Sequence, residues 1–121
     1  MSLISVETME LAPGVWSIRL RGEMDASNLT QLKGAFSKIY AQKLYRVVLN
    51  LSEIKYLSSS AIGVIIGGFT TAVKNGGRLV LVATPPSVLE VLRLIGLGAV
   101  LSFAPDEKSA LLKLEKHGDP T

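Results

Sequence analysis

Hydrophobic and polar residues alternate near the start of the chain, as they do in a strand with one buried face. In residues 15–21, Trp16, Ile18 and Leu20 alternate with a serine and two arginines. A weaker strand pattern covers residues 3–7, and Pro13-Gly14 predicts a turn between the two segments. We therefore expect an antiparallel hairpin at the start of the chain.

Two later segments, residues 47–51 and 79–83, are apolar almost without interruption. Runs of this kind are typical of central parallel strands that are covered on both faces. Apolar residues recur every three or four positions over 27–41 and again over 59–75, which predicts a helix before the first run and another between the two runs. The second helix and its flanking strands then form a right-handed crossover.

The two predicted helices each have an apolar stripe that should face the core. The stripe of the first helix consists of Leu29, Leu32, Phe36, Ile39 and Tyr40. The stripe of the second helix consists of Ile62, Ile65, Ile66, Phe69 and Val73. Asp25 or Ser27 can cap the first helix, and Gly76-Gly77 ends the second, as glycines often do.

The last third of the chain predicts a short helix over 87–95, a short strand over 100–103 and a terminal helix over 106–117. Leu111, Leu112 and Leu114 of the terminal helix are expected to point inward. The order of elements predicts an α/β fold, with a mixed sheet of about five strands, an N-terminal hairpin and four helices packed on the sheet. We expect a single domain over 1–121, with its core at about 3–114 and a short polar tail.

Length and composition limit the class of protein. The chain has 121 residues, of which 48% are hydrophobic and 19% charged, so it can form one packed core. No apolar run reaches the roughly 18 residues of a membrane-spanning helix. No signal-peptide pattern opens the chain. We therefore expect a cytoplasmic protein without membrane insertion.

Candidate catalytic groups are few. The chain has no cysteine and a single histidine, His117, near its end. A Ser-His-Asp triad lacks a well-placed base, and no cluster of histidines or carboxylates suggests a metal site. A phosphate-binding loop of the G-x-x-x-x-G-K type is also missing. We expect a binding protein rather than an enzyme, with no cofactor and no metal.

The formal net charge of +3 does not by itself indicate a nucleic-acid binder. Lysines and arginines are scattered along the chain, and their one cluster, in residues 106–116, contains acidic side chains as well. With 6% aromatic residues there is no set of rings on which bases could stack. We expect no direct contact with nucleic acid.

The serine run Ser58-Ser59-Ser60 is the first place that can carry a function. A loop predicted over 52–57 follows a central strand, and the serines lie where the second helix begins. Sites in open α/β sheets form at the carboxyl ends of strands. The unpaired N–H groups and partial positive charge of a helix N-terminus favour an anion, including a phosphate on a serine. The alternative is that the serines only cap the helix.

Two further segments are candidates. Gly22-Glu23-Met24-Asp25 lies between a strand and a helix, and it is either a tight turn with a capping Asp25 or an acidic rim beside the serines. Gly67 and Gly68 lie inside the second helix, with Gly63 one turn earlier, and each costs about 1 kcal/mol relative to alanine. These glycines serve either close packing within the protein or a face for a partner's helix.

The order of these segments resembles the STAS domain family, which comprises sulphate-transporter and anti-sigma factor antagonist domains. The resemblance extends from about Leu3 to Leu114. Residues 21–25, Arg-Gly-Glu-Met-Asp, are similar to the family's Gly-Glu-(Leu/Ile/Met)-Asp turn. Residues 47–64 are similar to its signature, which begins Asp-Leu-Ser and ends Asp-Ser-(Ser/Thr)-Gly-(Leu/Ile)-Gly.

The resemblance implies a bacterial anti-sigma factor antagonist. Stand-alone members bind an anti-sigma factor that is also a serine kinase and so release the sigma factor. The kinase phosphorylates the first serine of the signature, and a serine phosphatase resets it. Carried over to this chain, the acceptor is Ser59, with Ser58 and Ser60 as alternatives. The implied partner-binding residues are Gly22, Glu23, Met24, Asp25, Ser58, Ser59, Ser60 and Ala61.

Two positions depart from the signature: Ser58 stands in place of its Asp and Ala61 in place of its Gly. The first change removes a negative charge beside the acceptor, and the second adds a methyl group where a partner approaches. These changes are therefore expected to affect the regulatory cycle more than the fold. Two other functions stay open: an unphosphorylated scaffold or transporter-associated module, and a module that binds a nucleotide or lipid phosphate. A homo-oligomer or a larger signalling assembly also stays open.

Overall fold

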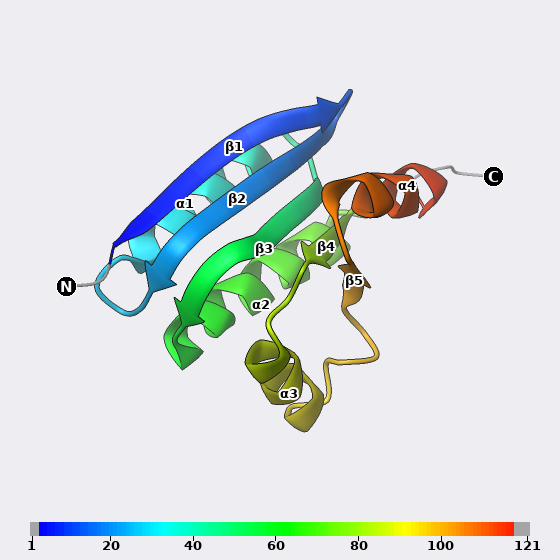
Figure 1. Ribbon diagram of the computed structural model, residues 1–121. Coiled ribbons are helices and arrows are strands. Elements are labelled where there is room, and N and C mark those ends of the chain that lie inside the picture. Colours follow the sequence, from blue (N-terminus) through cyan, green and yellow to red (C-terminus); the bar gives the residue numbers. More distant parts are fainter. Residues whose placement is uncertain (1–2, 118–121) are drawn as a thin grey trace.

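The computed structural model describes residues 3–117, and their side chains as far as residue 115. The described residues form one five-stranded sheet in the order β1-β2-β3-β4-β5 (Figure 1). The strands are Ile4–Ala12 (β1), Val15–Met24 (β2), Arg46–Leu57 (β3), Arg78–Val82 (β4) and Ser102–Ala104 (β5). The helices are Leu29–Tyr40 (α1), Ser59–Lys74 (α2), Pro86–Leu94 (α3) and Glu107–His117 (α4).

The sheet is mixed, as the sequence predicts. β1 and β2 form an antiparallel hairpin, and β2, β3, β4 and β5 run parallel to one another. The predicted fold class is therefore confirmed over the described residues. The predicted polar tail follows the core that ends at about residue 114, and its last residues, 118–121, lie outside the part of the chain that the structure describes.

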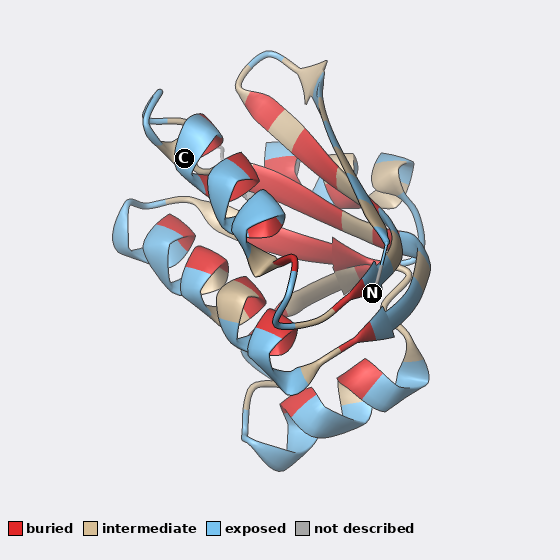
Figure 2. Cartoon of the chain, turned by 90° about the vertical axis from the view of Figure 1, so that its left-hand side faces the viewer, coloured by how far each residue is buried: buried red, intermediate tan, exposed pale blue. Residues whose placement is uncertain are grey.

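The two faces of the sheet are covered unequally. Helices α1, α2 and α3 pack on one face, and α4 packs on part of the other (Figure 1). Leu49 and Leu81 point to the first face, and Val48 and Val80 to the second. All four side chains are fully buried, which confirms that the two apolar runs are strands covered on both faces. Figure 2 shows the buried residues on the central strands and on the helix sides turned toward them.

Three strands are longer than the sequence pattern predicts. β1 and β2 both continue beyond their predicted ends, and β3 includes residues 52–57, which the pattern assigns to a loop. The extensions of β2 and β3 pair in parallel as far as Met24 and Leu57, with two irregularities in register. Most side chains of 52–57 are exposed, so this part of β3 lacks the apolar run that marks its buried half.

The helix cores differ in detail from the predicted stripes. Val73 and Leu112 were expected inside, but they are 52% and 62% exposed. The small residues Ala72 and Ala110 occupy the buried positions beside them and are fully buried. Hydrophobicity alone does not distinguish a small residue in close contact with a strand from a larger one beside it that points to solvent. Leu114 is fully buried as predicted, and Leu111 is partly buried.

The ends of α1 and α2 are set by local backbone geometry. The N-cap position of α1 is Asn28, rather than the predicted Asp25 or Ser27, because these two residues belong to the preceding turn. At the end of α2, Gly76 has a φ of +77° and the N–H of Gly77 donates to the carbonyl oxygen of Ala72 at 2.8 Å, which confirms the predicted glycine stop. Within residues 3–117 no helix has both the length and the apolar character needed to cross a bilayer.

Candidate functional site

The structure brings the predicted turn and the serine run together at the carboxyl edge of the sheet. Met24 at the end of β2 pairs with Leu57 at the end of β3. The backbone N–H of Ser58 then donates to the carbonyl oxygen of Met24 at 3.0 Å. Segments more than thirty residues apart in the sequence are thereby held side by side, where open α/β sheets form their sites.

The three serines differ in their surroundings. Ser58 is the N-cap of α2, and its hydroxyl oxygen accepts a hydrogen bond from the N–H of Ala61 at 3.2 Å. The hydroxyl groups of Ser58 and Ser60 lie 3.0 Å apart and share a hydrogen bond. Ser59 is exposed, and its hydroxyl makes no hydrogen bond to any other residue that the structure describes.

Ser59 and Ser60 also face different depressions of the surface. Ser59 lines a cleft of about 270 Å³ between the end of β3 and helix α3, together with Tyr56 and Val91. Ser60 lines a groove between α1 and α2. Successive residues of a helix point about 100° apart, so adjacent serines at its start face different neighbours. A group added to either serine would therefore enter a different part of the surface.

The turn before α1 is organised by two side chains. The Asp25 carboxylate accepts hydrogen bonds from the N–H and the hydroxyl of Ser27, at 2.9 and 2.6 Å. The Asn28 side chain accepts from the N–H of Asp25 at 3.0 Å and donates to the carbonyl oxygen of Glu23 at 3.0 Å. Asn28 is 7% exposed and escaped the sequence analysis, because a single asparagine before a helix looks like any other turn residue.

Gly22, Glu23 and Met24 are strand residues rather than the tight turn that the sequence left open. Gly22 has a φ of +107°, and an added Cβ would lie 2.4 Å from the carbonyl oxygen of Leu3. That carbonyl accepts the N–H of Glu23 at 2.8 Å. Glycine at position 22 therefore allows the backbone of Leu3 to lie close to β2.

Two of the predicted partner-binding residues are buried. Met24 and Ala61 are both fully buried in the core on the helix side of the sheet. Their side chains are therefore not available at the surface of this fold, and partner binding at these two positions stays a prediction. Both were predicted because they lie within motifs, and a motif also contains residues that only pack beneath the site.

The glycines of α2 divide into two kinds. An added Cβ at Gly68 would lie 2.5 Å from the ring of Phe36, and the carbonyl oxygen of Gly68 accepts the Tyr40 hydroxyl at 2.8 Å. Gly68 thus serves close packing of α1 on α2, as one of the two predictions had it. At Gly63 and Gly67 an added Cβ would have nothing within 4 Å, so internal packing does not explain them.

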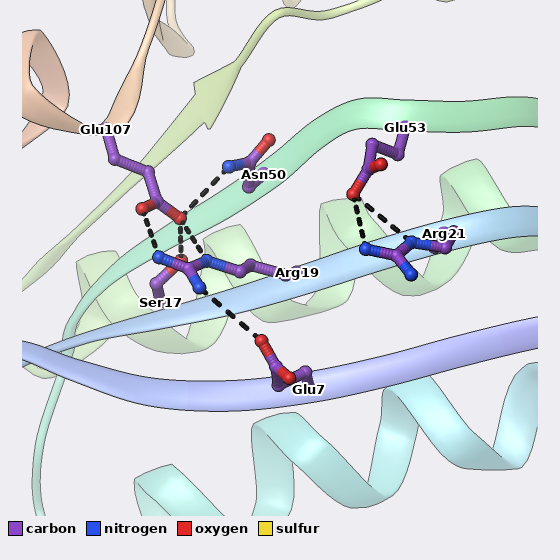
Figure 3. A network of polar contacts seen from close by, with 7 residues as sticks. All are labelled: Glu7, Ser17, Arg19, Arg21, Asn50, Glu53 and Glu107. Atoms are coloured by element: carbon purple, nitrogen blue, oxygen red, sulfur yellow. Dashed lines mark hydrogen bonds and ion pairs between the residues drawn. The ribbon is translucent and has the colours of Figure 1, made fainter.

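A polar network on the opposite face of the sheet went unrecognised in the sequence. The Glu107 carboxylate accepts two hydrogen bonds from the Arg19 guanidinium, at 2.7 and 2.8 Å (Figure 3). It also accepts the Ser17 hydroxyl at 2.7 Å and the Asn50 amide at 3.0 Å. The bond with Arg19 is the main reason that the pKa of Glu107 falls from its ordinary 4.5 to about 2.

This network anchors α4 and leaves little free charge for a ligand. Glu107 lies in the first turn of α4, while Ser17, Arg19 and Asn50 belong to β2 and β3. Arg21, the next arginine along β2, is paired with Glu53 at 2.9 Å. Among the described residues there is also no group of three histidine, cysteine or acidic side chains that could hold a metal ion. The better candidate site is therefore the carboxyl edge of the sheet with Ser58, Ser59 and Ser60, which we call the serine edge.

The fold and the exposed serine edge define a small α/β domain that presents the N-terminus of a helix to its surroundings. This chain belongs to the STAS domain family, whose model matches residues 8–110. The Anti-sigma F factor antagonist of Paenibacillus polymyxa is 29% identical to it over 108 residues, which make up 88% of this chain and 92% of that protein.

Solved structures of similar proteins share the fold. An anti-sigma factor antagonist from Mycobacterium paratuberculosis has a TM-score of 0.81 at 22% identity, and the match covers 93% of this chain and 95% of that one. The Bacillus cell fate determinant SpoIIAA in its phosphorylated form has a TM-score of 0.76 at 23% identity, over 90% of this chain and 98% of that one. At these identities the likeness shows the architecture alone.

Proposed function

We propose that this protein is an anti-sigma factor antagonist whose binding is switched off by phosphorylation of Ser59. In the unmodified state it binds an anti-sigma factor that is also a serine kinase, and the sigma factor is released. The kinase transfers the γ-phosphoryl group of ATP to the Ser59 hydroxyl, and a serine phosphatase removes it. Membership of the STAS family and the similarity to named antagonists support this proposal.

The contrast between the three serines is the observation that carries the proposal. The Ser58 hydroxyl caps α2 and the Ser60 hydroxyl is bonded to it, whereas the exposed Ser59 hydroxyl has no such bond within the described chain. A kinase needs an accessible hydroxyl that it can align with the phosphoryl group. Of the three candidates, Ser59 meets that need best.

The departures from the family signature do not remove the surface. Ser58 provides the cap of α2 with its hydroxyl in place of a carboxylate. The methyl group of Ala61 is buried and takes no room from a partner. The edge available to a partner then consists of the exposed parts of Glu23, Asp25, Ser59 and Ser60.

A phosphate at Ser59 explains the switch in electrostatic terms. It adds about −1.5 to −2 charges at neutral pH beside the N-terminus of α2, where the folded chain tolerates an anion. In the complex the same phosphate would be desolvated against the partner. A thousandfold loss of affinity corresponds to about 4 kcal/mol, which an unpaired phosphate in an interface can supply.

The modification is tested by incubating the protein with ATP and each anti-sigma kinase encoded in the same genome, followed by peptide mass spectrometry. We expect one phosphate, on Ser59. Ser59→Ala should abolish the modification, and the matched control Ser60→Ala should retain it. Absence of phosphate on all three serines, or phosphate on Ser58 or Ser60 alone, would refute the gating mechanism.

A further inference from the structure

A groove of about 790 Å³ lies between α1 and α2. Its apolar lining comes from Leu29, Phe36 and Tyr40 of α1 and from Val64, Gly67 and Gly68 of α2. Both helices connect parallel strands and run in the same direction (Figure 1). The residues that line the groove span about three turns of each helix, or about 15 Å.

The floor of the groove is kept open by glycine at a cost to the helix. Gly68 is accounted for by its contact with Phe36. Gly63 and Gly67 are exposed, and an added Cβ would meet nothing within 4 Å, yet glycine inside a helix costs about 1 kcal/mol relative to alanine. Packing within the described chain therefore does not account for these two residues. A body that packs closely against α2 from outside would gain from them.

The charged residues of these two helices are all basic. Neither α1 nor α2 contains an aspartate or a glutamate, although the chain has ten acidic residues. Lys33 lines the groove on α1. Lys74 lies seven residues after Gly67 and hence on the same side of α2, at the other end of the groove. The groove is apolar along its floor and has a cation toward each end.

We propose that this groove binds an amphipathic helix of the partner, with apolar side chains along its floor and acidic side chains beside Lys33 and Lys74. The cations select an acidic segment, and a groove between two parallel helices accommodates a third helix. A membrane surface fits less well because the apolar groups line a hollow instead of protruding. The identity of the partner as an anti-sigma factor rests on the proposed function. The amphipathic, acidic character of the bound helix is inferred from the groove alone.

The groove is connected with the serine edge. Ser60 lines its end, directly beside Ser59. A phosphate on Ser60 would place negative charge at the end of the acidic helix, and a phosphate on Ser59 would place it one residue away, in the neighbouring cleft. The same modification would then weaken both parts of the interface.

The groove is tested with two variants that differ only in position. Gly67→Gln fills the groove with a good helix former, and Gly34→Gln is its control, because Gly34 is exposed on α1, has equal free space and does not line the groove. We expect both variants to unfold at the wild-type temperature or above. Gly67→Gln should lose at least tenfold in affinity for the anti-sigma factor, and Gly34→Gln should bind as wild type. Equal affinities of the two variants would overturn the proposal.

The chemistry of the occupant is tested without the natural partner. The probe is a designed helical peptide of about 15 residues, with leucine on one face and glutamate on the other, beside its lysine counterpart. We expect the acidic peptide to shift the NMR signals of Gly63 and Gly67 and to bind at least tenfold more tightly than the lysine peptide. Lys33→Glu should reverse this order, whereas Lys108→Glu, on α4, should not. Equal binding of both peptides, signals shifted elsewhere, or binding only to anionic lipid vesicles would overturn the proposal.

The peptide and variant experiments together distinguish a failure of the groove proposal from a failure of the proposed function. If the acidic peptide binds in the groove but no anti-sigma factor of the genome binds the protein, the proposed function is wrong and the groove stands. If an anti-sigma factor binds wild type and Gly67→Gln equally, the proposed function stands and the groove proposal is wrong.

Discussion

Gly67 and Gly68 are neighbours in α2, yet their surroundings are opposite. The missing side chain of Gly68 makes room for the ring of Phe36, whereas that of Gly67 leaves the groove open. The same dipeptide thus combines internal packing with an external surface. Sequence alone named both uses for these glycines, but it could not assign either use to one residue.

Alanine at these two positions should change stability in opposite directions. Gly67→Ala should raise the free energy of unfolding by about 1 kcal/mol, because it removes only the helix penalty of glycine. Gly68→Ala should lower it by about 1–2 kcal/mol, because the new methyl group displaces the Phe36 ring. Urea unfolding followed by circular dichroism measures both. A destabilised Gly67→Ala would show that the space beside Gly67 is not free.

Glu107 is the residue whose role the sequence concealed most completely. Among the charges of residues 106–116 it looks like a counterion of neighbouring lysines, but it bonds to residues of β2 and β3 about 60 to 90 positions earlier in the chain. Only its position in the first turn of a helix that packs on the sheet gives it these partners. No local pattern carries that information.

Removal of the Glu107 carboxylate should destabilise the protein. Glu107→Ala leaves the fully buried Ser17 hydroxyl without its acceptor and the Arg19 guanidinium with Glu7 alone, which should cost about 2 kcal/mol. Glu115→Ala is the control, since it removes the same group from an exposed position of the same helix and should cost no more than about 0.5 kcal/mol. Equal losses of unfolding free energy in the two variants would show that the network does not hold α4 in place.

At the scale of elements, prediction succeeded where burial is continuous and failed where it is partial. The runs at 47–51 and 79–83 are central strands because both of their faces are covered. The extension of β3 to Leu57 was missed, since its exposed side chains read as a loop while its backbone pairs with β2. The serine edge was found from its motif, but its division into a capping, a free and a groove-facing serine required the direction of each side chain.

The start of α2 provides a test of that division. Ser58→Ala should lower the free energy of unfolding by about 1 kcal/mol, because the N–H of Ala61 loses its acceptor. Ser59→Ala, one residue later, should leave stability within about 0.5 kcal/mol of wild type. Thermal unfolding of the two variants in parallel measures the difference. If Ser59→Ala proves the more harmful, the assignment of the cap to Ser58 is wrong.

At the scale of the whole molecule, the two faces of the sheet have separate tasks. One end of the helix layer α1–α2 carries the serine edge and the groove, while α4 and the Glu107 network close part of the opposite face. The network binds α4 to strands that also position the serine edge. We therefore expect substitutions in the Glu107 network to change mainly stability, and substitutions at the serine edge or in the groove to change mainly the proposed partner binding.

Acid should weaken the whole fold through Glu107. Because folding lowers the pKa of this carboxyl from 4.5 to about 2, chiefly through the bond with Arg19, its contribution is fully present above pH 4.5 and is lost as the pH falls toward 2. The stability difference between wild type and Glu107→Ala should therefore be constant from pH 7 to about 5 and shrink below that. A difference that stays unchanged down to pH 2.5 would contradict the role of the ionised carboxylate.

The central claim is that one phosphate on Ser59 decides whether the anti-sigma factor is bound. The most direct measurement is isothermal titration of the anti-sigma factor with unmodified protein and with protein carrying phosphoserine at position 59, both in the same buffer and salt. We predict tight one-to-one binding of the unmodified protein and a loss of at least a hundredfold, about 2.7 kcal/mol, on phosphorylation. Equal affinity of the two forms, or tighter binding of the phosphorylated form, would contradict the account.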